Sequence, residues 1–255
     1  MDYTNKVVVL TGAAGGIGSE MVRRFAALGA STALLDVSME ALEKTIERLG
    51  LEPGRTFAGA VDVSDETSVK TVIADIIKRF GHIDVLINAA GIPGPSARTE
   101  DYSFADFKKV YSVNVFGTYL MMQNVLPLMQ ARHSGVILNF GSVSGMRGYP
   151  YEIAYGSSKA AIIHLTKNAA NENGGNGVRI NAISPGWVQT NMMRTIVESY
   201  KDVGIAHGAD YVTLGPMGRP AFPEEIANVA VFMCSDEAHY VNGSNFLVDG
   251  GMTLD

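Results

Sequence analysis

Seven short runs of apolar and β-branched residues recur along the chain, and amphipathic stretches of helical length separate them. The runs cover Val7–Leu10, Thr32–Asp36, Thr56–Val61, Val85–Asn88, Gly135–Phe140, Arg179–Ile183 and Asn245–Val248. They are nearly all apolar rather than alternating, which is typical of strands that helices cover on both faces. Strands that alternate with helices predict an α/β fold with one doubly wound, seven-stranded parallel sheet.

Composition and charge limit the class of protein further. The chain has 255 residues, of which 47% are hydrophobic, and it contains no repeat or linker, so we expect residues 1–255 to form one domain. A net charge of −6 argues against a nucleic-acid partner, which would require a basic face. The single cysteine, Cys234, and the scattered histidines predict no metal site. With no leader and no apolar run of membrane-span length, we expect a soluble, cytoplasmic protein without a membrane partner.

A glycine-rich segment follows the first predicted strand directly. Gly12, Gly16 and Gly18 lead into an amphipathic stretch, Ile17–Leu28, with helical periodicity. Glycine allows a tight turn, and it lets a pyrophosphate approach the free amides at the N-terminus of the helix. In this context the glycines predict a Rossmann dinucleotide site, to which an ordinary glycine-rich turn is the alternative.

Asp36 ends the second predicted strand, where an acid can reach the adenosine ribose of a bound dinucleotide. A carboxylate at this point accepts both ribose hydroxyls and repels the 2′-phosphate of NADP. The residues that flank the two motifs supply no cation for such a phosphate: Ala13, Ala14, Gly15, Val37 and Ser38. A helix-capping aspartate is the alternative interpretation, but the missing positive charge favours NAD as the cofactor.

A tyrosine and a lysine four residues apart form the second chemical motif. Tyr155 and Lys159 lie in a stretch, Tyr151 to Asn171, that is predicted to be helical, so they share one face of that helix. A cation about 4 Å away contributes a few kcal/mol at an effective dielectric near 20, so we expect Lys159 to lower the pKa of Tyr155. Ser142 follows the strand Gly135–Phe140 at the ligand-binding edge of the sheet. Its hydroxyl can hold a substrate oxygen while Tyr155 exchanges the proton.

Together these motifs resemble those of the classical short-chain dehydrogenases/reductases, over essentially the whole chain. Gly12 to Gly18 fits the family's TGxxxGxG motif, and Asn88 to Gly91 fits its NxAG segment. The resemblance implies a catalytic set of four residues: Asn114, Ser142, Tyr155 and Lys159. It also implies the following cofactor-binding residues: Gly12, Gly16, Ile17, Gly18, Asp36, Asp62, Val63, Asn88, Ala89, Gly91, Tyr155, Lys159, Pro185, Gly186, Val188 and Thr190.

The resemblance assigns roles to several of these residues. It implies that Asn114 holds a water in a proton relay through Lys159, and that Asp62 flanks the adenine. It implies that the segment from Pro185 to Thr190 contacts the nicotinamide carboxamide. The implied activity is the interconversion of a secondary alcohol and a ketone with NAD, and the implied assembly is a homotetramer.

Three loops are expected to form the substrate site: Ile92–Ser103, Val143–Tyr151 and Trp187–Gly215. The last is long for a connection, which predicts a substrate lid at about residues 187–215. The loops carry apolar and aromatic side chains: Ile92, Pro93, Met146, Tyr149, Tyr151, Trp187, Met192, Met193 and Ile196. An apolar, methionine-rich pocket predicts a hydrophobic or cyclic alcohol, unless these side chains only pack the lid onto the domain.

Two other functions compete with this interpretation. A 3-oxoacyl-acyl-carrier-protein reductase resembles this chain, but such enzymes typically take NADP and carry an arginine where Gly15 stands. A non-catalytic NAD-binding scaffold is the other alternative, and the complete set of Asn114, Ser142, Tyr155 and Lys159 argues against it.

Overall fold

The computed structural model describes residues 1–205 and 207–254, and its centre is a seven-stranded parallel sheet. The strands are β1 (Val7–Thr11), β2 (Ser31–Asp36), β3 (Thr56–Ala60), β4 (Val85–Asn88), β5 (Gly135–Phe140), β6 (Val178–Pro185) and β7 (Asn245–Val248). Their order in the sheet is β3-β2-β1-β4-β5-β6-β7. The predicted doubly wound parallel sheet is therefore confirmed, with strand limits that differ from the predicted ones by two residues at most.

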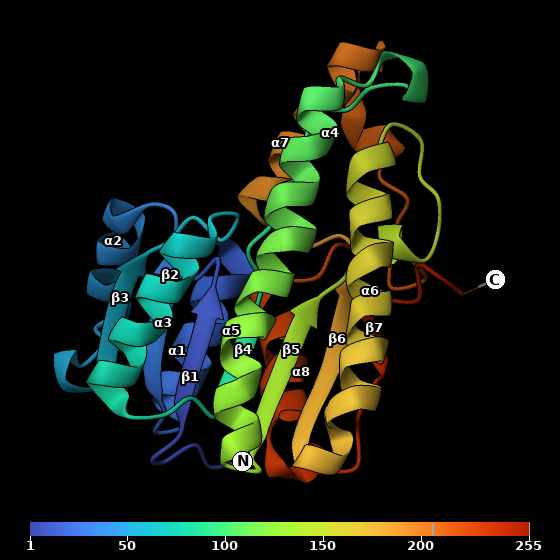
Figure 1. Ribbon diagram of the computed structural model, residues 1–255. Coiled ribbons are helices and arrows are strands. Elements are labelled where there is room, and N and C mark those ends of the chain that lie inside the picture. The colour runs from blue at the N-terminus through green and yellow to red at the C-terminus, as the bar shows by residue number, and fades with distance from the viewer. Residues whose placement is uncertain (206, 255) are drawn as a thin grey trace.

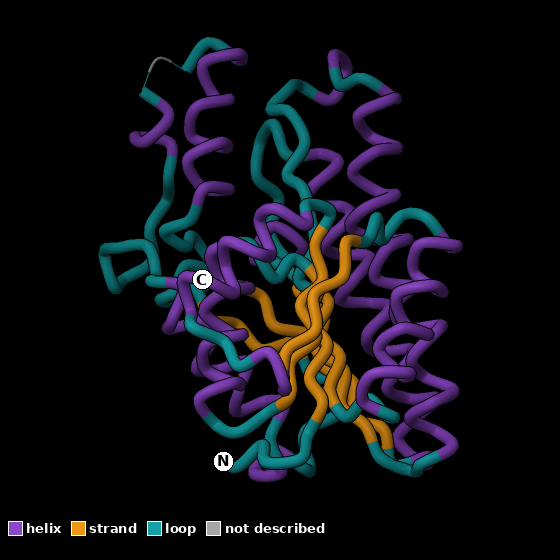
Figure 2. Tube along the Cα trace, turned by 90° about the vertical axis from the view of Figure 1, so that its left-hand side faces the viewer, coloured by secondary structure: helices purple, strands orange, loops and turns teal. Residues whose placement is uncertain are grey.

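Helices cover both faces of the sheet, as the edge-on view in Figure 2 shows. They are α1 (Gly16–Ala27), α2 (Met39–Leu49), α3 (Glu66–Phe80), α4 (Phe104–Tyr111), α5 (Thr118–Ala131), α6 (Ile153–Asn173), α7 (Asn191–Ser199) and α8 (Pro223–Cys234). One core lies under α1, α2 and α8 and includes Phe25, Leu42 and Ile226. The other lies under α3, α5 and α6 and includes Ile76 and Met121. Strands that are buried from both sides explain why the sequence runs are continuously apolar.

The order of the strands reverses at β1, which pairs with β2 on one side and with β4 on the other. The connection after β1 therefore runs toward β2, and the connection after β4 runs the other way toward β5. Because these two connections diverge, a crevice opens between them at the carboxyl ends of β1 and β4. Ligands of open α/β sheets bind in such a crevice. In Figure 1 the α4, α6 and α7 helices rise above this edge of the sheet.

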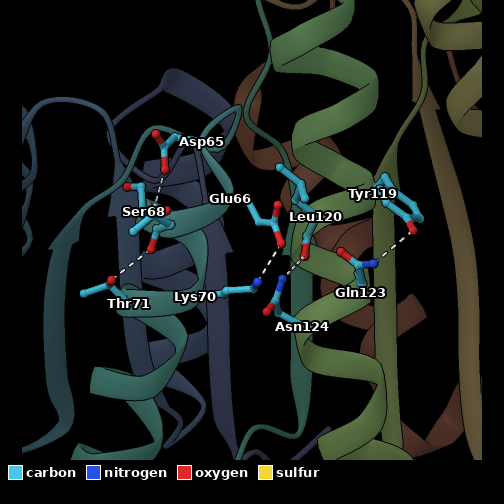
Figure 3. A network of polar contacts seen from close by, with 10 residues as sticks. Asp65, Glu66, Ser68, Lys70, Thr71, Tyr119, Leu120, Gln123 and Asn124 are labelled. Atoms are coloured by element: carbon cyan, nitrogen blue, oxygen red, sulfur yellow. Dashed lines mark hydrogen bonds and ion pairs between the residues drawn. The ribbon is translucent and has the colours of Figure 1, made fainter.

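The start of α3 differs from the sequence interpretation in one detail. We expect Ser64 to cap this helix, but the cap is Asp65, whose carboxylate accepts from the amide of Ser68 at 2.7 Å (Figure 3). Ser64 is held instead by the side chain of Asp62. At α8 the expected first-turn proline, Pro223, is confirmed.

A π-helical segment, Ser112–Gly117, joins α4 to α5 in one long continuous helix. Such widened turns are rare, and they occur frequently at functional sites because they redirect side chains. Asn114 lies inside this segment and is fully buried. Periodicity in the sequence does not reveal the extra residue in the turn.

The described part of the chain includes no helix with the length and apolar character that crossing a membrane requires. Its longest helix, α6, has 21 residues and carries the candidate catalytic tyrosine and lysine.

Candidate active site

The glycine-rich turn between β1 and α1 is too crowded for side chains. Gly12 has a φ of +69°, and a Cβ atom added to it would lie 3.0 Å from the backbone of Ala89. A Cβ atom on Gly18 would collide with the carbonyl oxygen of Gly12. Only glycine fits at either position, and the turn leaves the amino end of α1 open toward the crevice. This is the cradle that a dinucleotide pyrophosphate requires, so the residues present fit such a cofactor.

Asp36 lies across the end of β2 from this turn, and its side chain is half-buried. Its Oδ2 atom accepts from the amide of Ala14 at 3.2 Å, which ties the acid to the glycine-rich turn. The following residues, Val37 and Ser38, supply no cation. The structure therefore brings the predicted acid to the predicted phosphate cradle.

Asp62 and Val63 follow β3, on the same edge of the sheet. The exposed Asp62 carboxylate accepts from the amide of Ser64 at 2.9 Å and from its hydroxyl at 2.6 Å. Val63 is buried, and its side chain occupies the space that a Cβ atom on Gly117 would need. Both predicted residues lie beside the crevice, with Val63 packed against the π-helical segment.

Thr11 organises the segment after β4, although it is absent from the predicted site residues. Its Oγ1 atom accepts from the amides of Ala89 and Ala90, both at 3.1 Å. The predicted residue Asn88 donates to the side chain of Asn139 at 2.8 Å, which joins β4 to β5. The threonine of the glycine motif thus fixes the start of the loop that carries Gly91. Its place in the motif, directly before Gly12, was the available signal.

Asn114 connects that loop to α6. Its Oδ1 atom accepts from the amide of Ile92 at 2.8 Å, and its Nδ2 atom donates to the Ile92 carbonyl and to the Ser158 hydroxyl, both at 3.0 Å. A Cβ atom on Gly91 would lie 3.2 Å from Asn114 Oδ1 and 3.4 Å from Lys159 Nζ. The absence of a side chain at Gly91 therefore leaves room for the asparagine and the lysine to meet.

Lys159 is buried, with 4% of its surface exposed, and its Nζ atom donates to the carbonyl of Phe140 at 2.8 Å. Desolvation lowers the pKa of this lysine to about 8. The ammonium also lies 5.6 Å from the centre of the Tyr155 ring. A lysine with this pKa can exchange protons near neutral pH.

Tyr155 lines the same cleft, one helical turn before Lys159. Loss of hydration and, to a smaller extent, the negative charge of Glu152 together raise the pKa of Tyr155 to about 12, against the opposing effect of a hydrogen bond with the Ser142 side chain. We expected the lysine to lower this pKa, and the structure gives the opposite direction. The physical reason is that burial of the phenol is the largest influence on its pKa, and the hydrogen bond with Ser142 opposes it only in part.

A cleft of about 820 Å³, counted with its opening to solvent, runs from Ile17 past these groups to α7. Ten predicted site residues line it: Ile17, Ala89, Gly91, Ser142, Tyr155, Lys159, Pro185, Gly186, Val188 and Thr190. The remaining predicted residues lie outside its lining: Gly12, Gly16, Gly18, Asp36, Asp62, Val63, Asn88 and Asn114. They form the glycine-rich turn and the layer of contacts around it.

The predicted substrate loops divide in the same way. Five of their named side chains line the cleft: Tyr149, Trp187, Met192, Met193 and Ile196. Ile92, Pro93, Met146 and Tyr151 do not. The structure also adds Ser144, which lies in the predicted loop Val143–Tyr151 but is not among its named side chains, and Glu152 and Met252, which lie outside the predicted loops and carry no motif.

The segment predicted as a lid begins with α7, which Thr190 caps by accepting from the amide of Met193 at 3.3 Å. Thr190 also touches the glycine-rich turn, because a Cβ atom on Gly16 would lie 2.9 Å from its methyl group. The helix therefore starts at the cofactor cradle and continues over the cleft. The predicted range 187–215 includes residue 206, which lies outside the described residues.

Comparison with known proteins agrees with this geometry. A family model described as enoyl-(acyl carrier protein) reductase matches residues 12–253. The chain is 36% identical to levodione reductase of Leifsonia aquatica, covering 98% of this chain and 95% of that protein. It is 37% identical to meso-2,3-butanediol dehydrogenase of Serratia marcescens, with 99% and 96% covered. It is 34% identical to the 3-oxoacyl-[acyl-carrier-protein] reductase FabG of Thermotoga maritima, with both chains covered completely.

Solved structures give the same result. An NAD⁺-bound xylitol dehydrogenase superposes with a TM-score of 0.92 at 34% identity, covering 98% of this chain and all of the other. The NADP-bound ElxO superposes with a TM-score of 0.89 at 30% identity, covering 98% and 99%. The chain therefore belongs to the short-chain dehydrogenase/reductase family, and it is an oxidoreductase that acts on CH–OH groups with a nicotinamide cofactor.

Proposed function

We propose that this protein is an NAD-dependent dehydrogenase that interconverts a secondary alcohol and a ketone, and that its substrate is a cyclic or otherwise hydrophobic alcohol. The observation that carries the proposal is the shared cleft of Ser142, Tyr155 and Lys159, which begins at the glycine cradle. A hydroxyl, a phenol and an amine beside a dinucleotide site are what proton transfer at a carbinol oxygen requires.

NAD is proposed over NADP because of Asp36. Its carboxylate is held against the glycine-rich turn by the Ala14 amide, where it would meet the 2′-position of the adenosine ribose. A 2′-phosphate would approach a like charge without a compensating cation among the adjoining residues. Solved structures of relatives contain either cofactor, so the proposal of NAD rests on Asp36.

The proposed chemistry divides among four side chains. When bound, the oxidised cofactor supplies the hydride acceptor and a positive charge. Ser142 donates to the carbinol oxygen, and Tyr155 accepts the alcohol proton as a phenolate, a form that the positive charge of the oxidised cofactor would favour against the raised pKa. Lys159, with its pKa of about 8, exchanges that proton with solvent, and Asn114 holds the neighbouring loop and helix in place.

The substrate class follows from the outer part of the cleft and from the relatives. Met192, Met193 and Ile196 of α7 give this part an apolar wall. Levodione reductase and meso-2,3-butanediol dehydrogenase are named for small oxygenated substrates, one cyclic and one open-chain, and both resemble this chain over nearly its full length. Reduction of a 3-oxoacyl-[acyl-carrier-protein] is the second candidate function, because the Thermotoga maritima reductase is similar to this chain over its whole length.

We also propose a homotetramer in the cytoplasm. The outer face of the α4–α5 helix exposes Phe104, Phe116 and Tyr119 at 72%, 54% and 46%, and aromatic side chains that gather on one face favour an interface. Figure 3 shows Tyr119, whose hydroxyl accepts from Gln123 at 3.1 Å. The lone, buried Cys234 fits a reducing compartment. Sedimentation equilibrium of the wild type and of Phe116→Ser tests the assembly.

The test of the activity is NADH formation by the purified protein with a panel of secondary alcohols. The panel contains open-chain alcohols and diols, cyclic alcohols and sterols, each assayed with NAD and with NADP, and an acetoacetyl thioester is assayed with NADPH. Turnover of a cyclic or small apolar alcohol with NAD supports the proposal. Thioester reduction with NADPH in the absence of alcohol turnover would favour the carrier-protein reductase instead. Tight NADH binding without turnover of any of these substrates would favour a non-catalytic NAD-binding scaffold.

A further inference from the structure

The cleft contains three buried polar atoms that make no hydrogen bond with any described residue: the Tyr149 hydroxyl, Glu152 Oε2 and Trp187 Nε1. Across the described residues only six buried side-chain atoms are in this condition, so half of them gather in one cleft. A buried polar group without a partner costs free energy, and such groups are rare in folded proteins. Their concentration beside Ser142 and Tyr155 indicates that a polar ligand completes them.

Glu152 is the most informative of the three residues. It is the N-cap residue of α6, and its Oε1 atom accepts from the Tyr200 hydroxyl at 3.4 Å, which leaves Oε2 uncommitted. Burial raises the pKa of this carboxyl, and its hydrogen bond with the Tyr200 side chain opposes the shift. The Glu152 carboxyl and the proposed catalytic Ser142 line the same cleft.

The backbone segments that carry Tyr149, Glu152 and Trp187 are fixed by the surrounding structure. Tyr151, between Tyr149 and Glu152, has a φ of +68°, a conformation that is costly for a bulky residue and that persists where the surrounding structure imposes it. The carbonyl of Trp187 accepts from the amide of Ala221 at 2.8 Å, which anchors the segment that carries the indole. The three polar groups therefore project from two fixed segments.

We propose that the alcohol carries a second hydroxyl close to the reacting one, and that Glu152, Trp187 and Tyr149 bind this second oxygen. The inference rests on the proposed dehydrogenase function and narrows its substrate to cyclic or largely apolar alcohols that carry a second hydroxyl, and to the matching hydroxyketones. A hydroxyl is both donor and acceptor, so it can donate to Glu152 and accept from the indole N–H, which is a donor only. An ammonium has only donors and would leave the indole unpaired, and a simple alcohol would leave all three groups unpaired.

The first test compares three matched substrates with NAD: cyclohexanol, 1,2-cyclohexanediol and 2-aminocyclohexanol. We expect the diol to exceed cyclohexanol in kcat/KM by about 100-fold, because a site built to bind a hydroxyl discriminates strongly against an analogue that lacks it. In Glu152→Leu we expect the kcat/KM for the diol to differ from that for cyclohexanol by no more than about threefold. In Glu152→Gln, whose side chain can still accept from a hydroxyl, we expect a preference for the diol between that of Glu152→Leu and that of the wild type. The exposed Glu172 on the same helix provides the control, since Glu172→Gln keeps the wild-type ratio.

A binding measurement keeps the test independent of turnover. Trp187 is the only tryptophan of the chain, so its emission reports directly on the cleft. In Tyr155→Phe loaded with NAD, the diol should shift this emission and bind about tenfold or more tightly than cyclohexanol, and addition of Glu152→Leu should abolish the difference.

Three results would overturn the inference while leaving the dehydrogenase function intact. They are equal kcat/KM values for the diol and cyclohexanol, preference for the amino alcohol, and a diol ratio that Glu152→Leu does not change. If no alcohol of any kind yields NADH and none shifts the emission, the proposed function fails and this inference fails with it.

Discussion

The two halves of the cleft are constructed in different ways. The cofactor half comes from consecutive residues, the glycine-rich turn from Gly12 to Gly18, with Asp36 one strand further along. The substrate half comes from three separate segments that contribute Glu152, Trp187 and Met252. Local steric requirements determine the first half, whereas tertiary packing assembles the second. A function whose residues are adjacent in sequence can be recognised there, and one whose residues meet only in space cannot.

The halves also differ in how their polar groups are paired. On the cofactor side the Thr11 hydroxyl accepts from two amides, and Asn114 uses its whole amide group on Ile92 and Ser158. On the substrate side Glu152 and Trp187 each keep an atom without a partner among the described residues. The cofactor side keeps one such atom, Asn88 Oδ1, whereas the substrate side keeps three when the Tyr149 hydroxyl is included. The substrate side is therefore the half that depends more on a ligand to complete its hydrogen bonds.

The largest effect is expected from Gly18→Ala. The added methyl group would collide with the Gly12 carbonyl oxygen, so the turn must shift and the phosphate cradle opens. We expect NADH affinity to fall by about 1,000-fold, which corresponds to about 4 kcal/mol, as measured by fluorescence titration. Gly54→Ala is the control, because nothing lies within 4 Å of its added Cβ atom. Unchanged affinity in Gly18→Ala would show that the local steric account of this half is wrong.

The buried Lys159 gives a pH-dependent prediction about stability. Its pKa is about 8 in the folded protein against 10.5 for the free side chain, so between these values the unfolded chain binds more protons. The unfolding free energy of the wild type, relative to that of Lys159→Met, should therefore rise between pH 8 and pH 10.5, by up to about 3 kcal/mol, and be lost again as the pH falls. Urea unfolding of both proteins across this range measures it. A difference that stays flat would mean that the lysine is not desolvated.

Cofactor choice is expected to change by a smaller amount. Asp36→Ala removes the like charge that opposes a 2′-phosphate, so the ratio of kcat/KM for NAD to that for NADP should fall by about 30-fold, or about 2 kcal/mol. Steady-state kinetics with both cofactors measure the ratio. Glu40→Ala, an exposed acid at the start of the next helix, should leave it unchanged. If the ratio in Asp36→Ala equals that of the wild type, Asp36 does not determine the preference for NAD and another part of the site must do so.

Much of the fold and of the cofactor half could be predicted from the sequence. Strands buried on both faces leave continuous apolar runs, and for that reason the limits of β4, β5 and β7 coincide with the predicted ones. The glycine turn was predictable because a positive φ at Gly12 and the crowding at Gly18 exclude other residues.

Other features depend on contacts that the sequence does not display. The π-helical turn around Asn114 inserts a residue that no periodicity reveals. The cap of α3 is Asp65 rather than Ser64, because the side chain of Asp62 already binds the serine. The pKa of Tyr155 moves upward because desolvation depends on depth in the folded protein, which spacing to Lys159 does not reveal. A role of Glu152 in the substrate cleft could not be predicted from the sequence, because a single acid before a helix ordinarily serves as an N-cap.

The central claim is that Tyr155 performs proton transfer in a cleft whose cofactor half binds the dinucleotide without it. The most direct measurement is a pair of values for Tyr155→Phe, namely kcat with NAD and the best alcohol, and the dissociation constant of NADH. The account predicts a loss of about 1,000-fold in kcat, with a dissociation constant within about twofold of the wild type. Turnover that survives the substitution, or NADH binding that disappears with it, would contradict this account.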